Sequence, residues 1–96
     1  MSYFSAGDWT VKDGHDDRAF KDAWLASVEM DPPIEGLKVP PQLLEDLDRP
    51  GHYLSFAEWE SRDAINAFRS RPDFAEVIGR IKEHADFMIY TLEPVQ

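Results

Sequence analysis

The sequence predicts an α+β fold of the ferredoxin-like type, an antiparallel sheet with its helices on one face. Segments with strand character and segments with helical periodicity follow one another as strand, helix, strand, strand, helix, strand. That order is typical of the split βαβ arrangement. A chain of 96 residues is long enough for one domain, so we expect residues 1–96 to form it. No internal repeat or low-complexity segment is expected.

The first two elements are a strand at 3–11 and a helix at 17–30. The segment YFSAGDWTV is rich in aromatic and β-prone residues. KDGHDD (12–17) ends the strand, and Asp13, Asp16 or Asp17 is suited to cap the helix that follows. The apolar stripe of this helix has spacing i, i+3, i+4, i+7, i+8 and contains Phe20, Ala23, Trp24, Ser27 and Val28. The prolines of DPPIEG (31–36) end it.

The central part of the chain predicts two strands joined by a tight turn. Pro40 and Pro41 lack backbone donors, so a strand in 37–47 lies at a sheet edge, is bulged, or starts only at Gln42. DRPG (48–51) suits a type II turn with Pro50 and Gly51 at its central positions. HYLSFAEWE (52–60) has the clearest strand character of the chain.

The last third predicts a broken helical region and a final strand. Ser61 is a good N-cap for a helix whose one side carries Ala64, Ile65 and Phe68. Pro72 opens a second helical piece, so a kink or break is expected at 70–72. DFMIYTLEPV (86–95) is predicted to be a strand.

Large apolar side chains point to both sides of the predicted strands. In 52–60, Leu54 and Phe56 alternate with Tyr53 and Trp59, and the strands 3–11 and 86–95 show the same mixture. The helices can cover only one face, and the other would form an exposed apolar patch of a size that monomers avoid. We therefore expect a two-fold homodimer packed sheet against sheet.

Composition excludes several classes of protein. Acidic residues outnumber basic ones 19 to 10, for a net charge of −9, which disfavours nucleic acid and anionic membrane surfaces as partners. The absence of cysteine excludes disulfides, thiolate metal sites and a cysteine nucleophile. The N-terminal segment lacks signal-peptide features and no stretch resembles a membrane span. We expect a cytoplasmic protein.

The segment SFAEWESRDAINAFRSRPDF (55–74) resembles the antibiotic-biosynthesis monooxygenase (ABM) superfamily, whose members are dimeric α/β barrels. The pattern comprises Trp59, Glu60 and Ser61 at a strand end, then Phe68 and the step at 71–74. WTVKDG (9–14) with the helix after it, and LLEDLDRPGHYLS (43–55), are similar to the first strand, first helix and central hairpin of the family. The resemblance covers nearly the whole chain.

The resemblance implies two well-defined types of site. Haem-degrading members combine the tryptophan with a first-strand asparagine and a helical histidine, which would fall near Gly7 or Asp8 and near Ile78. Those residue types are missing, so haem degradation is disfavoured. Members that oxidise polyketide phenols without metal or flavin have an asparagine and a tyrosine that would fall near Ser55 and Ile65, and neither is present.

Candidate site residues follow from chemistry and from the resemblance together. The three histidines are far apart and show no metal-binding spacing, so no metal or cofactor is expected. His52 could act as a general base, although a solvated or rim histidine is the commoner case. Trp59 either packs in the core or lines a cavity, with Phe56, Tyr90 and Trp24 as possible companions around a flat aromatic ligand.

Three functions remain open from the sequence. The first is a cofactor-independent monooxygenase that oxidises an aromatic or phenolic molecule with O₂, with His52 as base and Trp59 as wall. The second is a non-catalytic dimeric module that binds a hydrophobic metabolite. The third is isomerisation or ring opening of a small carbonyl compound. A pocket of about 300 Å³ or more with His52 or a tyrosine inside would favour an enzyme, and a sealed space between the sheets without a polar group would favour the binding module.

Overall fold

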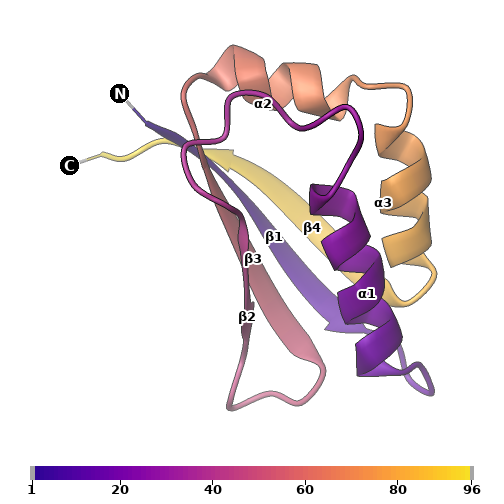
Figure 1. Cartoon of the computed structure of the whole chain (residues 1–96). Helices are drawn as coiled ribbons and strands as arrows, with labels where there is room; N and C mark the ends of the chain where they lie inside the picture. The colour runs from indigo at the N-terminus through magenta and orange to yellow at the C-terminus, as the bar shows by residue number, and fades with distance from the viewer. Residues whose placement is uncertain (1, 96) are drawn as a thin grey trace.

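The computed structural model describes residues 2–95, and in that range it has four strands and three helices. Their order is β1 (Tyr3–Val11), α1 (Asp17–Val28), β2 (Gln42–Glu45), β3 (His52–Trp59), α2 (Arg62–Arg69), α3 (Phe74–Lys82) and β4 (Ala85–Leu92). The strands form an antiparallel sheet in the order β2-β3-β1-β4. Figure 1 shows the helices on one face of this sheet. The predicted ferredoxin-like α+β fold is confirmed.

Local signals explain where the elements begin and end. Asp16 caps α1 by accepting a hydrogen bond from the backbone N–H of Arg18, and Ser61 caps α2 by accepting one from Ala64. The predicted break separates α2 from α3, and Pro72 lies in the intervening turn rather than in the first turn of α3. Helix α1 ends at Val28, two residues before the predicted end at 30.

The β2–β3 hairpin also forms as the sequence predicts. β2 begins at Gln42, directly after the two prolines, and pairs only with β3 within the described part of the chain. The backbone N–H of His52 donates to the carbonyl of Arg49 over 3.2 Å, and Gly51 has φ of 79°. A positive φ at the third residue defines the type II turn and favours glycine there.

Strand alternation gives the sheet two different faces. The odd-numbered residues of β1, β3 and β4 face the helices, among them Trp9, Trp59 and the fully buried Ala85. They build two core clusters with the helices. The first contains Trp9, Phe20, Trp24, Tyr53, Ile81 and Ala85, and the second contains Ala57, Trp59 and Ile65.

The even-numbered residues form the opposite face of the sheet, which no helix of residues 2–95 covers (Figure 1). Large apolar side chains on it are well exposed: Leu44, Phe56, Met88, Tyr90 and Leu92 are each 40% exposed or more. This two-sided apolar character is the one predicted from the strand sequences. Among the described residues, no helix is long and apolar enough to cross a membrane.

Candidate functional site

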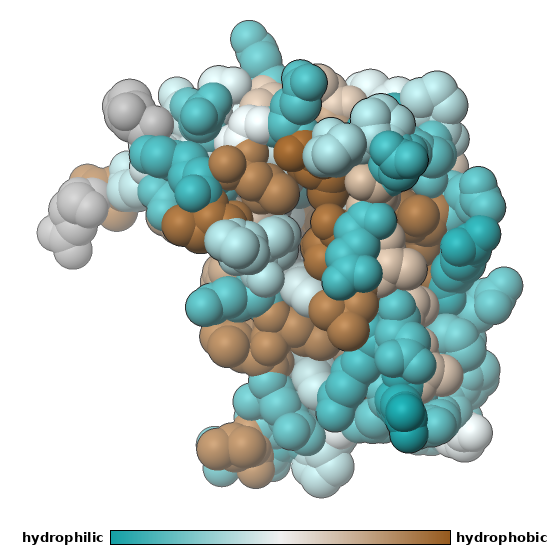
Figure 2. Space-filling view, in the orientation of Figure 1, coloured by the Kyte–Doolittle hydropathy of each residue, from teal (hydrophilic) through white to brown (hydrophobic). Residues whose placement is uncertain are grey.

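A small cavity of about 90 Å³ lies between the sheet and the helices, and it separates the two core clusters. Trp9 and Trp24 border it from the first cluster, and Ala57, Trp59 and Ile65 border it from the second. Figure 2 shows hydrophobic residues gathered around a hollow on this side of the molecule. The volume is below the roughly 300–1,000 Å³ of most ligand pockets, so the cavity as it stands accommodates little more than one aromatic ring.

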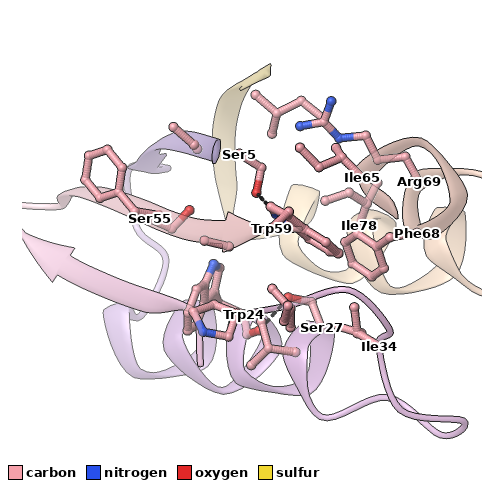
Figure 3. Close-up of a pocket in the computed structure, with 18 of the residues that line it drawn as sticks. Ser5, Trp24, Ser27, Ile34, Ser55, Trp59, Ile65, Phe68, Arg69 and Ile78 are labelled. Carbon is pink, nitrogen blue, oxygen red and sulfur yellow. Dashed lines mark hydrogen bonds between the residues drawn. The ribbon is translucent and has the colours of Figure 1, made fainter. Parts of the chain in front are cut away.

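Two tryptophan–serine hydrogen bonds build the floor of the cavity. Trp59 Nε1 donates to Ser5 Oγ over 2.9 Å, and Trp9 Nε1 donates to Ser55 Oγ over 2.8 Å. Figure 3 shows the first of these bonds beside Ile65 and Phe68. Each bond runs diagonally between the paired strands β1 and β3. Both indoles are therefore fixed in position, and each also packs against an aromatic neighbour, Trp59 against Phe68 and Trp9 against Phe20.

The two pairs arise from a repeated pattern that the sequence analysis did not recognise. SAGDW (5–9) in β1 and SFAEW (55–59) in β3 both have the form serine, any residue, small residue, acid, tryptophan. Because the two strands run antiparallel with Ser5 opposite Ala57, each serine lies diagonally from the tryptophan of the other copy.

Glycine at two positions, one of them in the cavity lining, allows neighbouring segments to approach closely. A Cβ atom on Gly7 would lie 2.5 Å from Nε1 of Trp9, so only glycine lets this indole lie against β1. Gly36 has φ of 90°, and a Cβ there would lie 2.5 Å from the Cβ of Ala64. Gly36 accepts a hydrogen bond from the N–H of Glu60, which holds the segment between α1 and β2 next to α2.

Arg69 is the charged residue of the cavity lining. Its Nη1 donates to Thr91 Oγ1 over 2.5 Å and its Nη2 donates to the carbonyl of Tyr90 over 3.1 Å, so α2 is joined to β4. Figure 3 shows the side chain beside Ile65, reaching toward the yellow strand β4. Burial lowers the pKa of the guanidinium, yet an arginine keeps its charge in proteins. No carboxylate of residues 2–95 forms an ion pair with it.

The structure divides the five site residues predicted from the sequence between the two faces of the sheet. Trp59 and Trp24 line the cavity and are 2% and 5% exposed. Phe56 borders it, although its side chain lies on the opposite face and is 40% exposed. His52 and Tyr90 are on that opposite face and outside the cavity lining. The sequence analysis correctly separated Trp59 from Phe56 by alternation.

His52 has both ring nitrogens engaged. Its Nδ1 lies 2.7 Å from Asp46 Oδ2 and its Nε2 lies 2.7 Å from Asp8 Oδ1. Ionised carboxylates only accept hydrogen bonds, so the ring that satisfies both carries two protons. These hydrogen bonds, first that to Asp46 and then that to Asp8, raise the pKa of His52, and the bond from His52 lowers the pKa of Asp46. For His52 to accept a proton from a substrate, one of the two carboxylates would have to move away.

Tyr53 is a further titratable side chain near the cavity that already has a hydrogen-bond partner. Tyr53 does not line it, and its hydroxyl donates to Asp17 Oδ2 over 2.7 Å. Burial, and then this bond, raise the pKa of Tyr53. The cavity lining of the described chain contains no histidine, tyrosine, aspartate or glutamate. Its polar side chains are Arg69, the indoles, and three serines.

A pair of surface histidines is a further candidate site. His15 and His84 do converge, with their Nδ1 atoms 3.4 Å apart on the surface, but within residues 2–95 no group of three or more potential ligands could hold a metal ion.

A second recess of about 250 Å³ lies between residues 32–35 and α2. It is larger, but no tryptophan lines it, and its Arg71 is already paired with Asp73.

Comparison with known proteins confirms the resemblance deduced from the sequence. The family model described as antibiotic biosynthesis monooxygenase matches residues 41–80. No curated protein shows significant sequence similarity to the chain.

Solved structures match over nearly the full length. SnoaB from Streptomyces nogalater, a cofactor-independent oxygenase, has a TM-score of 0.86 at 17% identity, over 99% of this chain and 94% of that chain. Rv0793 from Mycobacterium tuberculosis has a TM-score of 0.80 at 16% identity, over 100% and 97%. A protein described as an antibiotic biosynthesis monooxygenase has a TM-score of 0.72 at 21% identity, over 100% of both chains. At these identities the likeness establishes the fold.

Of the positions to which the resemblance directs attention, all except Asp8, the alternative to Gly7, border the same cavity. Gly7, Ser55, Trp59, Ile65 and Ile78 each contribute to its lining. Four of them hold residues other than those of the two subgroups considered above. The residue types at these positions therefore differ from those of both subgroups.

Proposed function

We propose that this chain, as a single ABM-like domain, is a small cofactor-independent monooxygenase that oxidises an aromatic or phenolic molecule with O₂. The observation that carries the proposal is the cavity walled by Trp59 and Trp24, which also holds one cation and several hydrogen-bond donors. The family match at residues 41–80 and the fold shared with an oxygenase support it. The proposed location is the cytoplasm.

The proposed reaction begins with the anion of the substrate, which is electron-rich enough to react with O₂ directly. A carbon–oxygen bond forms between the ring and one oxygen atom, and the resulting hydroperoxide loses water. A phenol and one O₂ thus yield one quinone and one water. Residues of the cavity would supply a dry space and stabilise the anion.

We also propose His52 as the general base, but its position restricts where the substrate can bind. His52 lies on the face of the sheet away from the cavity, between Asp8 and Asp46. It could serve a substrate only if the ligand is bound at that face, where Phe56 and Tyr90 are also exposed.

Homodimerisation through the uncovered face of the sheet is part of the proposal. The exposed apolar side chains there form a surface that water solvates poorly, and a two-fold contact would bury it. In such a dimer the cavity of each protomer stays on the helical side, and His52 lies at the interface.

A non-catalytic module that binds a hydrophobic metabolite is the second candidate. The small volume of the cavity and the absence of a titratable base from its described lining favour this alternative. Oxygen uptake on a panel of phenols and hydroquinones distinguishes the two. The native chain, Trp59→Phe and His52→Gln are compared: loss of uptake in Trp59→Phe alone assigns the reaction to the cavity, and loss in His52→Gln alone assigns it to the other face. If no substrate of the panel causes oxygen uptake, the non-catalytic binding module is the remaining candidate.

A further inference from the structure

Arg69 is a cation in an apolar cavity and has no counter-ion among residues 2–95. The chain carries 19 acidic residues, yet none of those described pairs with Arg69, and none lines the cavity. By contrast Arg71 and Arg80, nearby in sequence, are each paired with a carboxylate. A partly buried charge without a partner is unfavourable, so an anion bound next to Arg69 would relieve the cost.

The guanidinium has unused donors. An arginine carries five N–H groups, and here Thr91 and the Tyr90 carbonyl each accept one hydrogen bond. These two neutral acceptors hold the side chain between α2 and β4 without neutralising it. The remaining N–H groups are therefore free to donate to a carboxylate or phenolate oxygen.

The other polar groups around the cavity are donors as well. Ser5 and Ser55 each accept an indole N–H, and no bond donated by either hydroxyl is found in residues 2–95, so each hydroxyl proton remains free for a ligand. Within residues 2–95 the indole N–H of Trp24 has no hydrogen-bond partner. It is therefore accessible to solvent, because every fully buried side-chain nitrogen or oxygen in this range has a partner. A donor-rich apolar cavity suits a ring that bears oxygen acceptors.

From this arrangement we propose that the cavity binds an aromatic anion, one ring of which packs between Trp24 and Trp59 while its anionic oxygen pairs with Arg69. The inference rests on the proposed function and specifies its substrate class as phenols acidic enough to enter ionised, or aryl carboxylates. Since the described lining offers no base, the ligand brings its negative charge with it. Arg69 then acts as a specificity-determining residue.

The test compares ligands of similar shape and different charge by calorimetry or equilibrium dialysis. The probes are 4-nitrophenol, which ionises near neutral pH, benzoate, which is fully ionised there, and nitrobenzene, which is neutral. We expect at least one anion to bind the native chain about tenfold or more tightly than nitrobenzene, as for a charge-assisted hydrogen bond. Benzoate and 4-nitrophenol distinguish a carboxylate from a phenolate site.

Variants then assign the preference to Arg69. Arg69→Gln should remove it, Arg69→Lys should retain part of it, and Arg62→Gln, an exposed arginine of the same helix, should leave it unchanged. Equal binding of anions and nitrobenzene, or a preference that persists in Arg69→Gln, would overturn the proposal.

Should Arg69→Gln fail to fold, the native chain still provides a test. Affinity for 4-nitrophenol must rise with pH as the probe ionises, relative to benzoate and nitrobenzene measured at the same pH. Anion binding without oxygen uptake would refute the oxygenase function and leave this inference intact. Oxygen uptake that is unchanged in Arg69→Gln would refute this inference and leave the oxygenase function intact.

Discussion

The indole N–H of Trp59 donates to the hydroxyl of Ser5 over 2.9 Å, joining the end of β3 to the start of β1. With 2% exposure, Trp59 packs with Ala57 and Ile65 in the second core cluster and also borders the cavity. It is therefore both a core residue and a candidate ligand contact. Its counterpart in the antiparallel β1–β3 pair is Trp9, which donates to Ser55.

Trp59→Phe should destabilise the fold while preserving it. The substitution removes a hydrogen bond and part of a buried ring, so we expect the free energy of unfolding to fall by about 1–3 kcal/mol. Ser5→Ala should cost less, and the double variant should reveal a coupling of about 0.5–1.5 kcal/mol between the two side chains. Urea denaturation of the four proteins measures it, and strictly additive effects would contradict the role of the bond.

Gly7→Ala should displace the Trp9 indole. The added Cβ would meet Nε1 at 2.5 Å, and overpacking of this kind costs about 1–3 kcal/mol. Gly79→Ala is the matched control, because nothing lies within 4 Å of the new Cβ in α3 and alanine favours a helix by about 1 kcal/mol. Thermal unfolding should show a lower Tm for the first variant and an equal or higher Tm for the second; the opposite order would refute the close packing.

The Asp8–His52–Asp46 cluster should make the free energy of unfolding depend on pH. It should be highest over an intermediate pH range and should fall on both the acidic and the alkaline side. The pKa of His52 is raised above 6.5, so its contribution is complete below about pH 6.5 and is lost as pH rises through the raised value. The pKa of Asp46 is lowered from 3.8, so its contribution is present above that pH and is lost as pH falls through the lowered value.

A His52→Gln variant tests this dependence, with His84→Gln as control because His84 contacts neither aspartate. Denaturation midpoints measured from mildly acidic to alkaline pH should decline for the native chain and for His84→Gln. The decline should be smaller in His52→Gln. A decline of unchanged size in His52→Gln would contradict the role of this cluster.

Charge on the uncovered face of the sheet should prevent self-association. The native chain is expected to sediment as a dimer at micromolar concentration, and Met88→Glu, at a position 63% exposed on that face, should shift it to the monomer. Leu47→Glu introduces the same charge in the turn before β3, where the residue is 91% exposed, and should leave the dimer intact. A native monomer at that concentration would rule out the sheet-to-sheet contact.

Most of the fold could be predicted because local signals and alternation agree. Ser61, the prolines before Gln42 and the Pro50–Gly51 turn each act within a few residues, and each operates as expected. The division of β3 into two faces followed from a period of two, which placed Trp59 opposite to Phe56. Such inferences need no knowledge of what packs on either face.

The site was harder to predict because it depends on pairing between distant strands. Tyr90 and Trp59 are on different faces only because of the β1–β4 register, in which Tyr90 lies opposite Ala6. Arg69 gave no signal in the sequence, where it is one charge at the end of a helix. The repeat of serine and tryptophan in SAGDW and SFAEW was visible, and antiparallel pairing of its two copies would have indicated the cavity floor.

The most direct test of the central claim is oxygen consumption by a chain whose cavity has been filled. Val28 borders the cavity, and Val28→Phe should occupy much of its volume of about 90 Å³. If the cavity is the reaction site, the native chain consumes one O₂ per quinone formed from an acidic phenol, and folded Val28→Phe consumes none above background. Equal rates for the two proteins would place the chemistry elsewhere and contradict the account.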